Sequence, residues 1–167
     1  MVRKESVRAE FFEYFLRELQ LLAEFFAARS LKPNFREIHL GGGSPSFLKR
    51  ADVERLIGKI RDIVDISEIE EFAIEIDPRN VDEDMIKFYH DQGINRISFG
   101  VQDIHPDVQK AINRIQPIEM IEKLAEMRKY FKSLNFDLIY GLPKQTRQTV
   151  HDTLEAVKRM SPDRIAF

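Results

Sequence analysis

Hydrophobic residues recur at helical spacing in several segments of this chain. In the first segment, phenylalanine and leucine residues three or four positions apart predict an amphipathic helix from about Glu5 to Ala28. The same spacing predicts further helices over residues 53–64, 82–92, 106–112, 118–131 and 146–160. Asp52 is a candidate N-cap for the second of these helices, and Gly93 is a candidate C-terminal stop for the third.

Short apolar runs alternate with the helices and predict strands. They cover residues 35–40, 72–78, 96–102, 135–143 and 163–167. Apolar strands that alternate with amphipathic helices are typical of a parallel sheet with helical crossovers, so we expect the α/β class. No linker or low-complexity tract interrupts the pattern, which predicts one domain over residues 1–167. Because the order opens on a helix and ends on a strand, we expect an internal segment of a longer protein.

Composition narrows the function classes. The net charge of −2 offers no basic field for nucleic acid. No apolar run is long enough for a membrane span and no signal peptide opens the chain, so we expect a cytoplasmic protein. The absence of cysteine excludes disulfides, thiol nucleophiles and cysteine-ligated metal clusters held by this chain. The 4 histidines are scattered, so no zinc site is expected.

Polar and glycine residues gather where the predicted strands end, which is where parallel α/β folds bind ligands. They are Gly41–Ser44, Glu75, Asp77, Gln102, Asp103, Asp137, Tyr140 and Gly141, with Asn113 and Arg114 after a short helix. The three glycines indicate a close backbone approach, although a flexible turn remains the alternative. A carboxylate within an apolar strand is costly unless it is paired, so Glu75 and Asp137 favour ligand contact over structural pairing. Asp77 fits a simple turn cap better.

Several of these motifs together resemble a known family. They read "HLGGGSPSFL", "IEIDPRNVDEDMIKFYHDQGINRISFGVQDIHPDVQKAINRIQ" and "NFDLIYGLPKQT". In this order they resemble the oxygen-independent coproporphyrinogen III oxidases, which are radical S-adenosylmethionine (SAM) enzymes of haem biosynthesis. The resemblance runs from about Glu18 to Phe167. Related haem chaperones typically read "E-x-N-P", "GVQS" and "GR-x-H" at these points, whereas this chain reads "EIDPR", "GVQD" and "NRIQ".

The resemblance implies an incomplete TIM-type barrel of the radical SAM kind, with about five strands, and contacts with two SAM molecules. The residues that match contacts with the cluster-bound SAM are Gly42 and Glu75. The residues that match contacts with a second SAM are Gly43, Ser44, Gln102, Arg114 and Asp137. The family usually has threonine where Ser44 stands, which keeps the hydroxyl group.

The family reaction converts coproporphyrinogen III to protoporphyrinogen IX by oxidative decarboxylation of two propionates. It uses SAM, a [4Fe–4S] cluster and an electron donor. The family holds its cluster with a C-x-x-x-C-x-x-C loop, and this chain has no cysteine. We therefore expect the chain to be inactive alone, with no catalytic or metal-binding residue of its own, and to self-associate through exposed sheet edges.

Two alternatives stay open at this point. One is a haem-binding or haem-transfer protein of the same fold, which "GVQD" and "DPR" argue against. The other is a barrel without a cluster that serves as a binding or scaffold module. Haem titration would separate the first alternative from an oxidase.

Overall fold

The structure is a computed structural model that describes residues 5–167. Its residues group into two compact units, which are described separately below. The first unit comprises residues up to 38 together with residues 48–71. The second unit comprises residues 39–47 and 72–167. The expectation of one domain over residues 1–167 stays a prediction.

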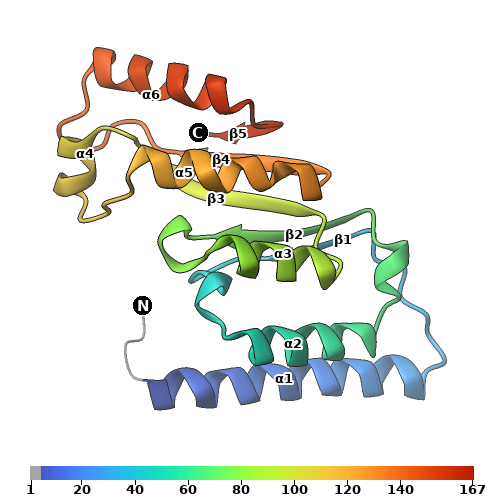
Figure 1. Ribbon diagram of the computed structural model, residues 1–167. Coiled ribbons are helices and arrows are strands. Elements are labelled where there is room, and N and C mark those ends of the chain that lie inside the picture. Colours follow the sequence, from blue (N-terminus) through green and yellow to red (C-terminus); the bar gives the residue numbers. More distant parts are fainter. Residues whose placement is uncertain (1–4) are drawn as a thin grey trace. The chain divides into compact units, whose positions relative to one another are not determined.

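Two helices form most of the first unit, α1 (Glu5–Ala28) and α2 (Arg50–Arg61). They lie along one another (Figure 1), and Phe12 and Leu16 of α1 are buried. Arg55 of α2 reaches the carboxylate of Glu13 with both terminal nitrogens, at 2.7 and 2.8 Å. The amphipathic helix predicted for residues 5–28 is therefore confirmed.

The predicted N-cap of α2 is wrong by three residues. Lys49, with an extended backbone, is the N-cap, and Asp52 lies inside the first turn with its N–H on the Lys49 carbonyl at 2.9 Å. An aspartate in the first turn still interacts favourably with the positive end of the helix dipole, so cap and first-turn positions look alike in sequence.

Five strands form one sheet in the order β1-β2-β3-β4-β5 (Figure 1). Their bounds are β1 Glu37–Leu40, β2 Glu71–Ile76, β3 Arg96–Gln102, β4 Ser133–Leu138 and β5 Arg164–Ala166. The pairs β2–β3, β3–β4 and β4–β5 are parallel, as the alternation of strands and helices predicts. The expected fourth strand, 135–143, is corrected to Ser133–Leu138. It ends there because Ile139 and Tyr140 are exposed and Gly141 has a φ of 78°, which no strand accommodates.

Four α-helices and three short 3₁₀ turns connect the strands of the second unit. They are α3 Glu83–Asp91, α4 Pro106–Ala111, α5 Ile118–Ala125, α6 Arg147–Met160, η1 Pro45–Phe47, η3 Pro78–Asn80 and η4 Glu126–Tyr130. The helix predicted over 118–131 is thus α-helical only to Ala125 and continues as a 3₁₀ turn. Asp82 caps α3 by accepting the Met85 N–H at 2.8 Å, and Gly93 follows its C-cap with a φ of 97°, as predicted.

The two faces of the sheet differ in chemistry, because successive strand residues point to opposite sides. One face is apolar and buried. Its residues are Phe72, Ile74, Ile76, Ile97, Phe99, Val101, Leu134, Phe136 and Leu138. The other face carries Glu75, Ser98 and Asn135, which are neighbours in the strand register, and Gly100 opposite Asp137. The candidate ligand residues within β2 and β4 therefore share the polar face.

Within residues 5–167, no helix combines the length and the apolar character that crossing a membrane requires.

Candidate functional site

The loop after β1 has a backbone that favours glycine. Gly42 and Gly43 have φ values of 75° and 66°, a region that L side chains rarely adopt. An added Cβ on either residue would meet nothing within 4 Å, so open space surrounds both. Ser44 follows at a φ of 96°, which is strained for a residue with a side chain. The loop is held in an uncommon conformation and leaves its backbone accessible.

Position 41 favours glycine because a side chain there would crowd its neighbours, whereas Gly42 and Gly43 are favoured by their backbone angles. A Cβ at this position would lie 2.7 Å from His39 Nε2 and 2.8 Å from Glu75 Oε1. These two atoms are themselves 3.0 Å apart, and the other oxygen of Glu75 accepts the Gly42 N–H at 3.3 Å. Glu75 is thus oriented through both oxygens while its side chain stays 44% exposed. Its exposure fits the predicted ligand contact, and its contacts also provide a structural partner.

The Gly41→Ala variant is expected to displace Glu75 and to lower ligand affinity at this site by about tenfold, since small misplacements of binding groups are costly. The stability loss should stay within about 1 kcal/mol, because both crowded atoms end flexible side chains. Titration calorimetry with SAM and urea unfolding measure the two effects. Gly58→Ala in α2 is the control, because its Cβ would meet nothing within 4 Å. Equal SAM affinity in wild type and Gly41→Ala would contradict the expectation.

The loop connects to Asp77 through two serines. The hydroxyl groups of Ser44 and Ser46 are 2.8 Å apart, and Ser46 Oγ accepts the Asp77 N–H at 3.1 Å. Asp77 caps η3 by accepting the Arg79 N–H at 3.1 Å, as the sequence predicts. Its carboxylate also accepts two hydrogen bonds from the Arg79 guanidinium, at 2.9 and 2.7 Å, and lies 3.5 Å from Arg114 Nη1.

The charge of Asp77 is stabilised although its side chain is only 5% exposed. Burial raises the pKa of Asp77, while the hydrogen bonds from Arg79 and the positive charge of Arg114 lower it by more. The net pKa lies below the ordinary value for aspartate, so Asp77 is ionised at neutral pH.

Arg114 lies over the end of β3. Its Nη2 donates to the Gly100 carbonyl at 3.0 Å and its Nε donates to Gln116 Oε1 at 3.3 Å. A Cβ on Gly100 would come within 2.9 Å of Arg114 and 3.0 Å of Gln102 Nε2, so the missing side chain makes room for both. Gln102 has a φ of 66° where the β3–β4 register shifts. A bulge of this kind re-aims a side chain at a strand end.

Asp137 has structural partners for both of its oxygens. Ser98 Oγ donates to Oδ2 at 2.9 Å, and Asn135 Nδ2 donates to Oδ1 at 2.7 Å. Asn135 also donates to Ser98 Oγ at 2.7 Å, which closes a triangle on the polar face of the sheet. The predicted ligand contact of Asp137 stays a prediction, because its present partners explain why a carboxylate is tolerated there.

The structure brings all seven predicted residues into one set. Gly42 contacts Glu75 directly, and Ser44 is linked through Ser46 and Asp77 to Arg114. Gly43 lies within the same loop, and Gln102 adjoins Gly100 beside Arg114. Asp137 is included because it lies opposite Gly100 in the β3–β4 register. The sequence alone does not indicate His39, Gly100 or Gln116, which act through contacts between strands or loops.

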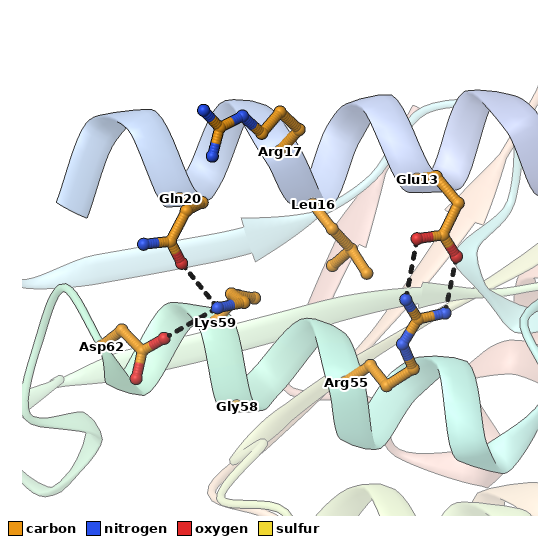
Figure 2. A pocket seen from close by; sticks show the side chains of 8 residues that line it. All are labelled: Glu13, Leu16, Arg17, Gln20, Arg55, Gly58, Lys59 and Asp62. Atoms are coloured by element: carbon orange, nitrogen blue, oxygen red, sulfur yellow. Dashed lines mark hydrogen bonds and ion pairs between the residues drawn. The ribbon is translucent and has the colours of Figure 1, made fainter. Parts of the chain in front are cut away.

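An open pocket of about 570 Å³ lies elsewhere, between α1 and α2 of the first unit. Figure 2 shows that several of its charged side chains already contact other side chains of the pocket. Arg55 pairs with Glu13, and Lys59 contacts Gln20 at 2.6 Å and Asp62 at 3.3 Å. None of the predicted ligand residues lines this pocket.

Metal binding finds no support in the part of the chain that the structure describes. Within residues 5–167, no three His, Asp or Glu residues are placed to hold a metal ion together. The whole sequence also lacks cysteine. A cysteine-ligated [4Fe–4S] cluster therefore does not fit the residues of this chain.

Comparison with known proteins places these observations in a family. The sequence profile of the radical SAM superfamily matches residues 3–157. The oxygen-independent coproporphyrinogen III oxidase of Helicobacter pylori is 38% identical over 165 residues, which cover 97% of this chain and 35% of that protein. The Escherichia coli protein of the same name is 34% identical over 168 residues, covering 99% of this chain and 36% of that protein. This chain thus spans about a third of the length of these relatives.

Solved structures agree with the sequence comparison. Coproporphyrinogen III oxidase from Escherichia coli, described as a radical SAM enzyme, matches with a TM-score of 0.87 and 32% identity, covering 99% of this chain and 38% of that chain. The radical SAM methyltransferase TsrM from Kitasatospora setae matches with a TM-score of 0.66 at 17% identity, covering 90% of this chain and 30% of its own, and shows the fold alone. The expected parallel α/β fold of the radical SAM kind is confirmed. Because the superfamily profile covers most of its length, this chain belongs to the radical SAM superfamily.

Proposed function

We propose that this chain forms the SAM-binding part of an oxygen-independent coproporphyrinogen III oxidase. In the whole protein, the substrate would be coproporphyrinogen III, the product protoporphyrinogen IX, and an electron donor would be required. The relatives at 34 and 38% identity bear the name of this enzyme, and the ordered motifs point to the same branch. The observation that carries the proposal is the connected set of predicted SAM contacts at the carboxyl ends of the strands.

The chemistry of this set fits SAM. The backbone at Gly42 and Gly43 is accessible and offers polar groups to the amino acid end of the ligand. Glu75 is half exposed and can accept from an ammonium or a ribose hydroxyl. Arg114 suits a carboxylate, and Asp137 offers a negative charge to the sulfonium. Ser44 and Gln102 supply further polar contacts, so all seven predicted residues are assigned to this site.

The residues of this chain bind and orient SAM, and no bond-breaking step is assigned to their side chains. Bound SAM supplies the hydrogen-atom abstraction that begins oxidative decarboxylation. Glu75 is oriented by His39 and the Gly42 N–H, and the Arg114 guanidinium is held by Asp77. No step is assigned to the iron–sulfur cluster here, since this chain has no cysteine to ligate it.

Titration calorimetry tests SAM binding directly. We expect the 167-residue chain to bind SAM more weakly than about micromolar, because a cluster would supply part of the site. Glu75→Gln should weaken binding by a further factor of about ten, since it removes the carboxylate charge. Glu54→Gln, an exposed glutamate of α2, is the control. A wild-type chain that binds no SAM at millimolar concentration would contradict the proposal.

The chain alone is expected to form no protoporphyrinogen IX under anaerobic conditions with SAM and a reductant, because it cannot ligate the cluster. Porphyrin fluorescence after oxidation of the product measures this. Haem titration in the same buffer is the companion experiment. A stable Soret shift would favour a haem-binding protein of the same fold over the oxidase.

We further propose a cytoplasmic location and self-association through the β5 edge. All three residues of β5 are exposed, and Ile165 and the following Phe167 have exposed fractions of 47% and 56%. An edge strand with exposed apolar residues can pair with a second copy. Light scattering at high concentration checks this, and a monomer under those conditions would contradict it.

A further inference from the structure

Arg114 is a loop residue whose side chain is held more firmly than its backbone position suggests. It follows α4 and comes directly after Asn113, which has a φ of 53°. Its side chain is only 23% exposed and reaches β3. A long side chain loses much rotamer freedom when it is fixed in this way, so its anchors have to offset that cost.

Each nitrogen of the guanidinium has one anchor. Nε donates to Gln116 Oε1 at 3.3 Å, Nη2 donates to the Gly100 carbonyl at 3.0 Å, and Nη1 lies 3.5 Å from Asp77 Oδ2. Because the guanidinium is planar, contacts at all three nitrogens fix the plane as well as the position. At least one N–H on each of Nη1 and Nη2 is left for a ligand.

The Gln116 anchor is itself rigid. Its side chain is 1% exposed, and its Nε2 donates to the same Gly100 carbonyl at 2.7 Å. Its backbone exchanges hydrogen bonds with the buried side chain of Gln109, at 2.9 and 2.8 Å. Gln116 is therefore fixed in place by its own contacts, and it determines where the Arg114 guanidinium lies.

The single negative charge of Asp77 does not balance the two positive charges that it contacts. One carboxylate serves two guanidinium groups, those of Arg79 and Arg114. Burial lowers the pKa of Arg114, which shows that its charge is incompletely solvated, although arginine stays protonated. A partly buried, surplus cation with two unused donors favours an anion of planar, forked geometry, which is a carboxylate.

We propose that Asp77 and Gln116 are positioning residues that hold Arg114 for the carboxylate of an amino acid ligand. They thereby set the preference for SAM over its decarboxylated analogue. This inference rests on the proposed function, since it takes SAM as the ligand of the site. It adds two residues that touch no ligand themselves and act through Arg114.

The test compares the affinities of the chain for SAM and for decarboxylated SAM, titrated by calorimetry. We expect the wild type to prefer SAM by about tenfold, as one charge-assisted fork implies. Arg114→Ala should abolish the preference, and Asp77→Asn or Gln116→Ala should reduce it by about threefold or more. Asp163→Asn is the matched control, because Asp163 is a partly buried carboxylate that pairs with the Arg128 guanidinium at 2.6 Å and takes no part in the candidate site.

The outcomes separate the two proposals. If the wild type binds neither ligand, the proposed function fails and this inference fails with it. If the wild type prefers SAM and both variants keep that preference, the inference alone is overturned. A merely structural role would lower stability and affinity for both ligands equally, leaving the ratio unchanged. Circular dichroism establishes that each variant is folded, and Gln116→Ala decides the question if Asp77→Asn is not.

Discussion

The Phe136→Ala variant is expected to lose about 3–5 kcal/mol of unfolding free energy, because it removes a fully buried ring from a packed core. Phe136 is 0% exposed and its ring centroid lies 6.2 Å from that of Phe99 on the neighbouring strand. The two residues are also paired in the β3–β4 register. A cavity there would remove contacts from both strands at once.

Urea unfolding followed by circular dichroism measures the loss for Phe136→Ala. Phe11→Ala is the matched control, since the same ring in α1 is 69% exposed. Its unfolding free energy should change by less than about 0.5 kcal/mol. Equal losses in the two variants would show that the apolar face of the sheet is not the main source of stability.

The Asp77→Asn variant is expected to lose about 2–3 kcal/mol at pH 7, since two partly buried guanidinium groups lose their shared counter-charge. Asparagine keeps an oxygen that can accept the Arg79 N–H, so the change isolates the charge from the turn cap. Both arginines remain partly solvated, with exposed fractions of 33% and 23%, which limits the loss.

The contribution of Asp77 also depends on pH. Burial raises its pKa, yet the hydrogen bonds from Arg79 and the charge of Arg114 bring the folded pKa below the unfolded one. The stabilisation is therefore complete above the unfolded pKa of about 4 and is lost as the pH falls through the folded pKa. Urea unfolding of wild type and Asp77→Asn from pH 7 down to pH 3 should show the difference shrinking below about pH 4. A constant difference over this range would contradict the argument.

The periodicity of the sequence predicts most of the fold, because both helices and strands have a face that must be buried. The parallel order, α1 and the ends of α3 follow from local signals that the structure confirms. The predicted boundaries of α2, α5 and β4 do not. The 3₁₀ turn after Ala125 continues the helical pattern of α5, so spacing alone cannot separate them. Asp52 suits a first-turn position as well as a cap.

The candidate site is predictable only in part. Strand ends and special residues indicate which positions to collect, and the contacts show that they form one set. The orientation of Arg114 depends on Gln116 and Gly100, which meet only after β3 and the loop past α4 are in place. Glycine has no side chain to reveal its purpose, so Gly41 and Gly100 are explained only by the atoms that a Cβ would strike.

Alternation along β2, β3 and β4 places the apolar core and the candidate ligand residues on opposite faces of the same strands. Phe136 belongs to the core, while its direct neighbours Asn135 and Asp137 belong to the polar face. A substitution at a polar position therefore changes the polar face without opening a cavity in the apolar core. A single-residue insertion or deletion within such a strand exchanges the two sets, placing carboxylates in the core and aromatic rings on the polar face. These strands therefore tolerate a substitution better than an insertion or a deletion.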